Sequence, residues 1–478
     1  MKQKQSDLEP DLCVIGGGAG GIALALGAAA KGLSAILVEK AVCGGYKLTH
    51  SLPLDLLISS SQAFATGNAA GLGHPHPRQE DAPAAFSAVL ANVRRACGTI
   101  AANYTQARLE AMNVRVLRAA GRFLAPDLCE AAGQKIRARR FVIAAGAAEK
   151  SLPIPGLDLI RPLNHASLVE LKHPPRKLIV LGNDPSGLAL AQAIRRFGSD
   201  VLVLMPEQSE WFGDEELAAV VRLALARDGI AVKEGARVSR VEPRGDRVCV
   251  FLKTAGHEKP LFGSHLWIAA GRAPAVEGLG LSEAKIRYSE KGITIKSCFR
   301  TGNPRVNAIG AVLGECGYNG AAEQHAWHLL EANFGRATIV KNKLMTTRVI
   351  PTCPHVAFAG LLEREARAVH GNICVLRWPF AETERARIAN LPYGHMKIVA
   401  DRQGIIIGAG IAGPKAEELI NIFAIAISEH MAVKDLAVAM PSHFAFAEAA
   451  RRACMTHPIG AGSRLSIPNI LPGLRWFR

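Results

Sequence analysis

The fold is decided by residues 12–21, which read LCVIGGGAGG. Four apolar residues, typical of a buried strand, run directly into Gly16, Gly18 and Gly21 in the spacing Gly-x-Gly-x-x-Gly. In this pattern Gly16 permits a tight turn, Gly18 lets a pyrophosphate approach the backbone, and Gly21 lets the following helix pack on the strand. The N-terminus of that helix offers unpaired N–H groups to phosphates. The segment therefore predicts a dinucleotide-binding βαβ unit.

The residues that follow complete this unit. An Ala-rich helix is expected to run to about Lys31, and residues 35–38 form a second apolar strand. Glu39 ends that strand, 23 positions after Gly16, where a carboxylate can accept hydrogen bonds from a ribose diol. Strand, glycines, helix and acidic residue together make the motif specific.

The same pattern recurs at residues 178–204, with Gly182 and Gly187 as the outer glycines of the turn. This copy is eroded, because Asp184 stands where the backbone should meet the pyrophosphate, and a carboxylate there adds bulk and repels phosphate. Met205 occupies the position of the ribose-binding acid, and Glu207, two residues further on, is a nearby acid that could take its place. We therefore expect weakened NAD(P)H binding. The alternative is that the second unit binds no nucleotide and serves only as scaffold.

The rest of the chain indicates an α/β protein of about three domains. Residues 141–146 and 266–271 read as the strands that close the two units, and from about Val349 the pattern changes to strands and two helices. The apolar stretch 404–427 is interrupted by Pro414 and charged residues, which favours a strand, a turn and a core helix over a membrane span. The expected domains are 1–155 and 276–345 for the first nucleotide domain, 156–275 for the second, 346–460 for an interface domain, and 461–478 for a C-terminal tail.

Composition excludes several classes of function. Lys and Arg number 57 against 41 Asp and Glu, a net charge of +16. We interpret this excess as a field that gathers anionic cofactors, and not as nucleic-acid binding, because no basic stretch is interleaved with aromatic residues. The ten cysteines form no Cys-x-x-Cys pair, so no metal site is expected. With neither a signal-peptide pattern nor a membrane span, a cytoplasmic location is the default.

Several ordered motifs beyond the first fingerprint resemble one family, the pyridine nucleotide–disulfide oxidoreductases, and most closely its dihydrolipoamide dehydrogenase and mercuric reductase branches. They are Glu39-Lys40 with Gly44-Gly45, residues 144–146 with 154–156, residues 270–274, residues 308–310, residues 407–409 with 413–414, and residues 443–448. The resemblance implies two Rossmann-like domains, of FAD and NAD(P) type, and an α+β dimerisation domain in a homodimer. It also implies FAD binding by Lys40, Gly45, Gly146, Gly310 and Ala311, besides the first fingerprint and Glu39, with Gly182 and Gly187 on the nicotinamide side.

The sequence departs from this family where the redox disulfide should be. Residues 44–55 read GGYKLTHSLPLD and contain no cysteine, whether aligned on the glycines or on Pro53. Asp55 replaces the family's flavin-side lysine, and an anion there would oppose reduced flavin unless burial raises its pKa. Ala311 replaces an aspartate that holds the flavin's ribityl chain, at a cost of about 1 kcal/mol.

One catalytic element of the family remains, since His443 and Glu448 keep its spacing of five. In the family the carboxylate fixes an imidazole that works as acid–base; packing at the dimer interface is the alternative. His50 is a second imidazole or a solvated loop residue. The sequence thus predicts an FAD-dependent oxidoreductase that passes electrons between NAD(P)H and an unidentified acceptor without an internal disulfide. The alternatives are a non-catalytic FAD-binding subunit, or reduction by a protein donor at the basic surface. For the tail, a plain terminus and a docking peptide both stay open.

Overall fold

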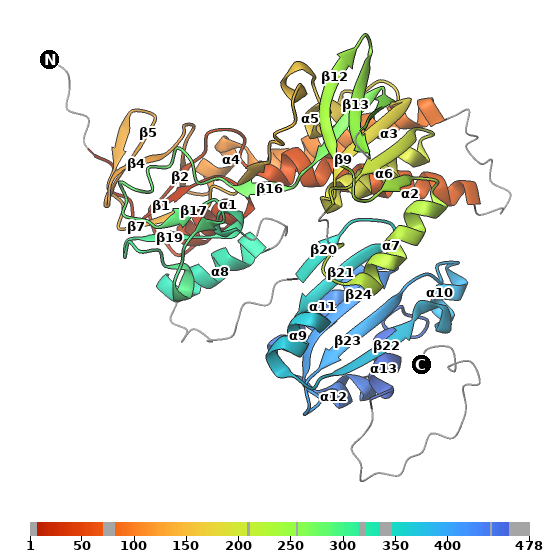
Figure 1. Cartoon of the computed structure of the whole chain (residues 1–478). Coiled ribbons are helices and arrows are strands. Elements are labelled where there is room, and N and C mark those ends of the chain that lie inside the picture. The colour runs from red at the N-terminus through yellow and green to blue at the C-terminus, as the bar shows by residue number, and fades with distance from the viewer. Residues whose placement is uncertain are drawn as a thin grey trace.

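The computed structural model describes residues 7–69, 82–207, 211–254, 257–314, 321–334, 347–439 and 442–457. The expected C-terminal tail lies outside these ranges. Figure 1 shows three bodies: the first sheet with its helices, a second sheet capped by a helical pair, and a C-terminal sheet below it.

The first body is a five-stranded parallel sheet in the order β19-β7-β1-β2-β3. Its strands are β1 (Leu12–Ile15), β2 (Ala35–Val38), β3 (Val114–Leu117), β7 (Arg140–Ile143) and β19 (Val306–Ala308). The chain leaves this sheet after β7 and returns at β19, so one domain is built from two distant stretches of sequence. Helix α1 (Ala19–Ala30) packs against α8 (Ala321–Phe334) on one face. Since β1, α1 and β2 lie where the pattern put them, the first predicted unit is confirmed.

The second body repeats this arrangement in a four-stranded parallel sheet of order β11-β10-β9-β15. Its elements are β9 (Lys177–Gly182), α6 (Pro185–Arg196), β10 (Asp200–Leu204), α7 (Glu215–Arg227), β11 (Ala231–Lys233) and β15 (His265–Ala269). An antiparallel sheet of β12 (Val238–Arg244), β13 (Arg247–Thr254) and β14 (His257–Gly263) adjoins it. The predicted duplication is therefore present in three dimensions.

Two long helices from the first half of the chain cover this second unit. They are α2 (Leu52–Ala69) and α3 (Ala82–Ala101), and α2 packs on α6 (Figure 1). A one-turn π-helix, η1 (Lys47–Ser51), leads into α2. π-helical turns are rare in proteins, and those that occur are often found at functional sites. The segment that carries the disulfide in the resembled family thus lies between the two nucleotide-binding units.

The C-terminal body is a five-stranded antiparallel sheet of order β20-β21-β24-β23-β22. Its strands are β20 (Thr347–Ile350), β21 (His355–Gly360), β22 (Cys374–Pro379), β23 (His395–Ala400) and β24 (Ile406–Gly413). Its helices are α9 (Glu363–His370), α10 (Glu384–Ile388), α11 (Ala416–Ser428), α12 (Val433–Val438) and α13 (Glu448–Met455), which is more than the two expected. The apolar stretch 404–427 forms β24 and α11 as predicted, and no helix in the described ranges is long and apolar enough to cross a bilayer.

Short elements complete the described chain. They are α4 (Gln106–Ala111), β4 (Arg122–Ala125), β5 (Leu128–Ala131), β6 (Gln134–Ile136), β8 (Ala147–Glu149), α5 (His165–Val169), β16 (Arg272–Pro274), β17 (Tyr288–Ser289) and β18 (Gly292–Ile293), with 3-10 turns that include η6 (Gly310–Leu313). Strands β8 and β16 pair antiparallel and carry the chain out of and back into the first domain.

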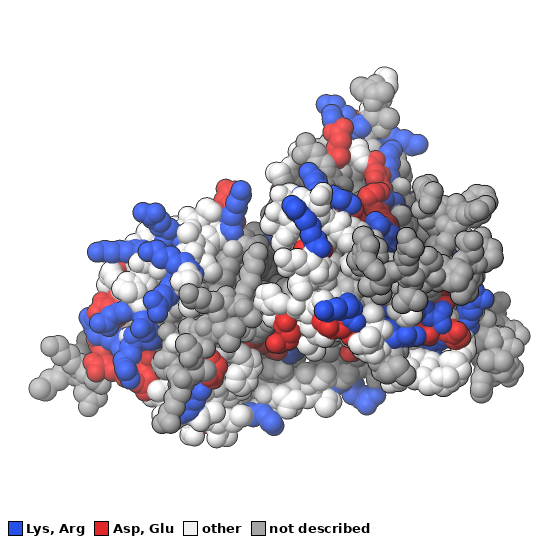
Figure 2. Space-filling model, turned by 90° about the horizontal axis from the view of Figure 1, so that it is seen from below, with Lys and Arg blue, Asp and Glu red and all other residues white. Residues whose placement is uncertain are grey.

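The excess positive charge does not form a continuous stripe on the face drawn in Figure 2, where blue and red side chains are interspersed. Some of the basic side chains are paired with acids: Arg137 forms ion pairs with both Asp7 and Asp127.

Candidate functional site: two phosphate cradles and the pocket between them

The turn between β1 and α1 is shaped to accept a pyrophosphate. A Cβ on Gly16, whose φ is +112°, would lie 2.3 Å from the Ala144 carbonyl oxygen, and one on Gly21 would lie 1.9 Å from the Gly16 carbonyl oxygen. Both positions therefore require glycine. Gly18 differs, because a Cβ there would meet nothing within 4 Å. The space beside Gly18 is open, as close approach of a phosphate requires.

The N-terminus of α1 has free donors for that phosphate. Gly18 is the N-cap residue, no side chain caps the helix, and no acidic residue stands in its first turn. Glu39 is buried, and its carboxylate accepts hydrogen bonds from the backbone N–H groups of Gly17 and Ala41, both at 2.6 Å. These two bonds fix the carboxylate beside the glycine turn, where a ribose diol would reach it.

Other residues expected to bind FAD surround this turn. Gly45 lies against Gly18, since a Cβ on Gly45 would be 3.1 Å from the Gly18 Cα, whereas the neighbouring Lys40 is exposed. Gly146 has φ +72° and open space where a Cβ would be. The structure thus brings the glycines of the predicted set to one edge of the first sheet.

The far side of the site contains a residue that the sequence analysis missed. Gly310, with φ +74°, donates its N–H to Nδ1 of the buried His325 at 3.2 Å, immediately before Ala311. Burial lowers the pKa of His325 to about 4, which keeps the imidazole neutral and able to accept that bond. His325 carries no motif of its own, and only the packing of α8 brings it to η6.

The second glycine turn is built the same way but is already occupied by a side chain. A Cβ on Gly182 would lie 2.0 Å from the Ala269 carbonyl oxygen, and one on Gly187 would lie 2.4 Å from the Ala269 Cβ. Asp184 is the N-cap of α6, and its carboxylate accepts from the Ser186 N–H at 3.0 Å and from the Ser186 hydroxyl. The donors that α1 leaves free for phosphate are therefore partly taken in α6.

The ribose side of this second turn is also altered. Met205 is buried in the core and offers no polar atom to a diol. Glu207 is paired with Arg237, whose Nε donates at 2.7 Å. Arg237 lies 30 residues along the chain and was not among the residues predicted for this site. Its guanidinium already neutralises the one carboxylate considered as a substitute.

A pocket of about 340 Å³ lies between the two units and the C-terminal sheet. It is lined by Tyr46, His50, Ser51, Leu54, Asp55, His165, Asn183, Asp184, Pro185, Ser186, Phe212, Ala270, Gly271, Arg272, Arg348, Val349, Ile350 and Pro351. The Arg272 guanidinium lies 3.7 Å from the centre of the Tyr46 ring. The His50 ring stacks on the Tyr46 ring, with 4.4 Å between the two centroids. His50 thus belongs to this wall and is not a solvated loop residue.

Two groups of the pocket are shifted in their titration. Desolvation raises the pKa of Asp55 to about 6, an effect that nearby His355 partly opposes. Burial raises the pKa of the Tyr46 phenol, so it stays protonated at neutral pH. A carboxyl with this pKa is still mostly ionised at pH 7, so the opposition to an anionic reduced flavin expected from the sequence is weakened but not removed.

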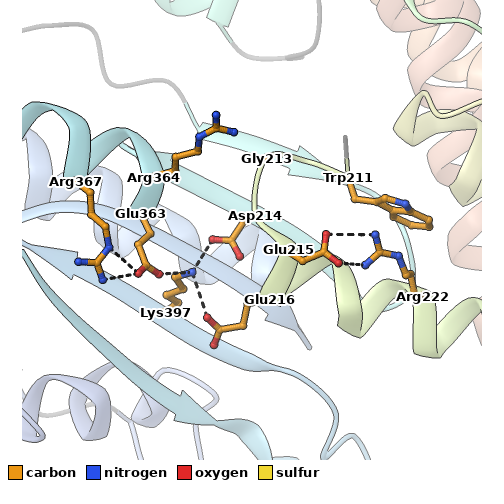
Figure 3. A pocket seen from close by; sticks show the side chains of 10 residues that line it. All are labelled: Trp211, Gly213, Asp214, Glu215, Glu216, Arg222, Glu363, Arg364, Arg367 and Lys397. Atoms are coloured by element: carbon orange, nitrogen blue, oxygen red, sulfur yellow. Dashed lines mark hydrogen bonds and ion pairs between the residues drawn. The ribbon is translucent and has the colours of Figure 1, made fainter. Parts of the chain in front are cut away.

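A larger pocket, of about 680 Å³, is structural in character (Figure 3). At its floor the buried Lys397 ammonium meets Asp214 and Glu363 at 2.8 Å and Glu216 at 3.2 Å. Asp214 also caps α7, while Lys397 comes from β23. The cluster joins the second nucleotide-binding unit to the C-terminal sheet, and its charges satisfy one another.

Comparison with known proteins agrees with this geometry. Residues 10–332 match the family described as pyridine nucleotide-disulphide oxidoreductase, and residues 346–454 match its dimerisation domain. The chain belongs to the pyridine nucleotide-disulphide oxidoreductases. The members of this family include dihydrolipoyl dehydrogenases and mercuric reductases, which are FAD-dependent oxidoreductases that use NAD(P)H.

Individual relatives cover nearly the whole chain. A dihydrolipoyl dehydrogenase from Thermus scotoductus is 30% identical over 444 residues, which span 91% of this chain and 94% of that protein. A mercuric reductase from Streptomyces lividans is 26% identical, over 93% of this chain and 96% of its own. Among solved structures, LpdA from Mycobacterium tuberculosis superposes with a TM-score of 0.82 at 22% identity, covering 94% of this chain and 99% of that one. The HOCl-induced flavoprotein disulfide reductase RclA from Escherichia coli gives 0.81 at 22% identity, over 93% and 99%. These two likenesses establish the fold.

For a pyridine nucleotide-disulphide oxidoreductase, the first cradle fits FAD: the glycine turn is open, the α1 donors are free and Glu39 is fixed. Where the family motif has its two cysteines, this chain has Tyr46, Lys47 and Ser51, depending on the alignment. The cysteines in the described ranges are all free, and the nearest of them, Cys43, is buried with a raised pKa caused mainly by desolvation.

The predicted acid–base pair of the family lies apart from the pocket lining. His443 is exposed and its ring lies 3.8 Å from that of Phe444, centroid to centroid. Glu448 begins α13 and pairs with Arg452 at 2.6 Å. Within the described part of the chain no hydrogen bond joins His443 to Glu448. A catalytic role for this pair stays a prediction that depends on the second subunit.

Proposed function

We propose that this protein is an FAD-dependent oxidoreductase that passes electrons from NAD(P)H to an acceptor without an internal redox disulfide. The observation that carries the proposal is the contrast between an intact first cradle and a cysteine-free segment 44–55. FAD held in the first cradle would supply two-electron redox chemistry between NAD(P)H and the acceptor, and the protein or solvent would supply the protons that the reduced acceptor takes up.

The pocket wall supports direct access of an acceptor to the cofactor. Tyr46 and His50 occupy the segment that holds the dithiol elsewhere in the family, and they leave a cavity instead of a sulfur relay. The protonated Tyr46 phenol is one group that can donate a proton to a reduced acceptor, such as a quinone or a disulfide of another molecule. His443, supplied from the second subunit of a homodimer, is the other.

An anaerobic titration tests the proposal. The purified holoprotein, titrated with NADH and separately with NADPH, is expected to lose its visible flavin absorption with either nucleotide. Cys43→Ser, which removes the thiol nearest the segment, should bleach at the parent rate because no sulfur takes part. A holoprotein that keeps its flavin band at saturating nucleotide would refute transfer from NAD(P)H. Loss of turnover in Cys43→Ser would refute the absence of a sulfur step.

One observation favours a second candidate, a non-catalytic FAD-binding subunit. Asp184 caps α6 and takes part of the donor set that a nicotinamide dinucleotide needs. Such a subunit would keep bound FAD and show neither bleaching with NAD(P)H nor reduction by a protein donor. The same titration, followed by addition of a reduced ferredoxin-type donor, separates this candidate from an enzyme that is reduced at its basic surface.

The dimerisation domain supports a homodimer, and the free cysteines suit a reducing, cytoplasmic setting. Light scattering on the eluting holoprotein should give twice the 50.8 kDa chain mass. A monomer that still turns over would remove His443 of a second subunit from the mechanism.

A further inference from the structure

Three potential metal ligands from separate parts of the chain meet beside the pocket. His50 comes from η1, Glu149 ends β8, and His165 begins α5. One ligand atom of each lies within 4.8 Å of the others. The family's dithiol chemistry uses none of these positions, and no sequence motif links them.

The distances suit a shared ion better than direct hydrogen bonds. Glu149 Oε1 lies 3.3 Å from His50 Nε2 and 3.5 Å from His165 Nδ1. Good hydrogen bonds from nitrogen to oxygen are about 2.7–3.2 Å long, so both separations are too great for strong ones. Nitrogen and oxygen ligands lie about 2.1 Å from a tetrahedral Zn²⁺, which places any two of them about 3.4 Å apart. The two separations measured from Glu149 Oε1 bracket that value, and the two imidazole nitrogens lie within 4.8 Å of each other.

His165 supplies the second observation. Its side chain is 5% exposed, and neither ring nitrogen has a hydrogen-bond partner. A buried imidazole with both nitrogens unsatisfied is costly, and native proteins rarely leave such groups without a ligand, water or ion. The ring is held in place by Trp267, edge to face at 4.9 Å, and by His50 at 4.4 Å.

The other two ligands are prepared for a cation. Thr49 Oγ1 lies 2.6 Å from His50 Nδ1, which orients the ring and leaves Nε2 directed at Glu149. Glu149, whose side chain is 56% exposed, places one carboxylate oxygen within reach of both imidazoles.

We propose that His50, Glu149 and His165 bind a divalent transition-metal ion of the Zn²⁺ class, with the fourth coordination position open to the pocket. Two imidazoles and one carboxylate form a recognised ligand set for zinc, and a site with three protein ligands keeps a position for water or substrate. The site does not depend on the proposed electron transfer: metal binding and flavin bleaching are measured separately, so failure of one leaves the other intact.

The test uses untagged, chelator-treated holoprotein dialysed against Zn²⁺ and analysed for metal per chain. One ion per chain is expected, with an increase in Tm. Co²⁺ as a second probe should give the visible absorption of a tetrahedral ion with nitrogen and oxygen ligands. Glu149→Gln, at a 56% exposed side chain that folding tolerates, should weaken Zn²⁺ binding at least about 100-fold.

Two further variants make the test specific. His165→Gln should also lose the ion, and its FAD content reports whether it has folded. His328→Gln changes an exposed histidine of α8 and should bind Zn²⁺ like the parent. The proposal is overturned if the parent binds no ion at about 100 μM Zn²⁺, or if Glu149→Gln retains the parent's affinity. A Co²⁺ spectrum dominated by sulfur ligands would also overturn it, because it would assign the ion to the cysteines.

Discussion

The contrast between the two helix N-termini leads to a prediction about nicotinamide affinity. Replacing Asp184 with glycine removes a carboxylate that accepts from the Ser186 N–H at 3.0 Å, and so returns that donor to the open turn. Two like unit charges about 4 Å apart, such as a phosphate and a carboxylate, repel each other by about 1 kcal/mol in bulk water and about 4 kcal/mol near a protein surface, where the effective dielectric constant is about 20. Allowing for solvent at this partly open pocket, we expect a gain of about 1–2 kcal/mol.

That gain corresponds to about 5- to 30-fold tighter NAD⁺ or NADP⁺ binding, since 1.4 kcal/mol is a factor of ten. Asp184→Asn is the matched control, because asparagine caps a helix as well as aspartate but carries no charge. It should recover the electrostatic part of the gain and keep the steric part of the obstruction. Glycine at this N-cap should cost only a few tenths of a kcal/mol in stability.

Calorimetric titration of the oxidised holoproteins with NAD⁺ and NADP⁺ measures these affinities without turnover. The expected order is glycine tightest, then asparagine, then the parent, with Tm values nearly equal. If both variants bind within twofold of the parent, the carboxylate is not what weakens the second cradle. If asparagine equals glycine, charge alone is responsible and the steric argument is wrong.

Three further predictions concern the first cradle, the domain joint and the pocket. Gly18→Val should lower FAD affinity at least about 100-fold at unchanged apoprotein Tm, because its side chain fills the open phosphate space; equilibrium dialysis measures this, with the equally unobstructed Gly98→Ala as the neutral control. Lys397→Met should lower the free energy of unfolding in the first denaturant transition by about 3–5 kcal/mol, because it leaves three carboxylates around a buried position. Lys177→Met, at an exposed ion pair, should lower it by under about 1 kcal/mol. Equal losses in the two variants would contradict the argument. Asp55 has a folded pKa of about 6, above its unfolded value, so its protonated form stabilises the fold and this contribution is lost as pH rises from about 4 through 6. Asp55→Asn should flatten the fall of stability with pH over this range, by about 1 kcal/mol or less because the side chain is exposed. If Asp55→Asn leaves the pH profile of Tm unchanged, the pKa of Asp55 is not shifted.

The parts of the site that sequence predicts well are those made by one continuous segment. Strand, glycine turn and helix at residues 12–30 fix the phosphate cradle, because each glycine's role depends on neighbours a few positions away. Asp184 was likewise identified from the sequence as an obstruction, and its capping of α6 depends only on the next two residues. In these cases local spacing and local geometry are the same information.

The parts that sequence does not predict are assembled from distant segments. His325 reaches Gly310 only because α8 packs beside η6, and Lys397 meets Asp214 across 183 positions of chain. The expectation of no metal site rested on cysteine spacing, which carries no information about two histidines and a glutamate spread over residues 50–165.

The sequence by itself determined the family, the duplicated nucleotide-binding unit and the absence of cysteine from segment 44–55. Only the tertiary structure decided what fills that segment's surroundings: a pocket wall in which His50, Glu149 and His165 converge. The physical reason is that βαβ units follow from short-range periodicity and steric rules, whereas the pocket follows from how α2, β8 and α5 pack, which depends on the shape of the whole core.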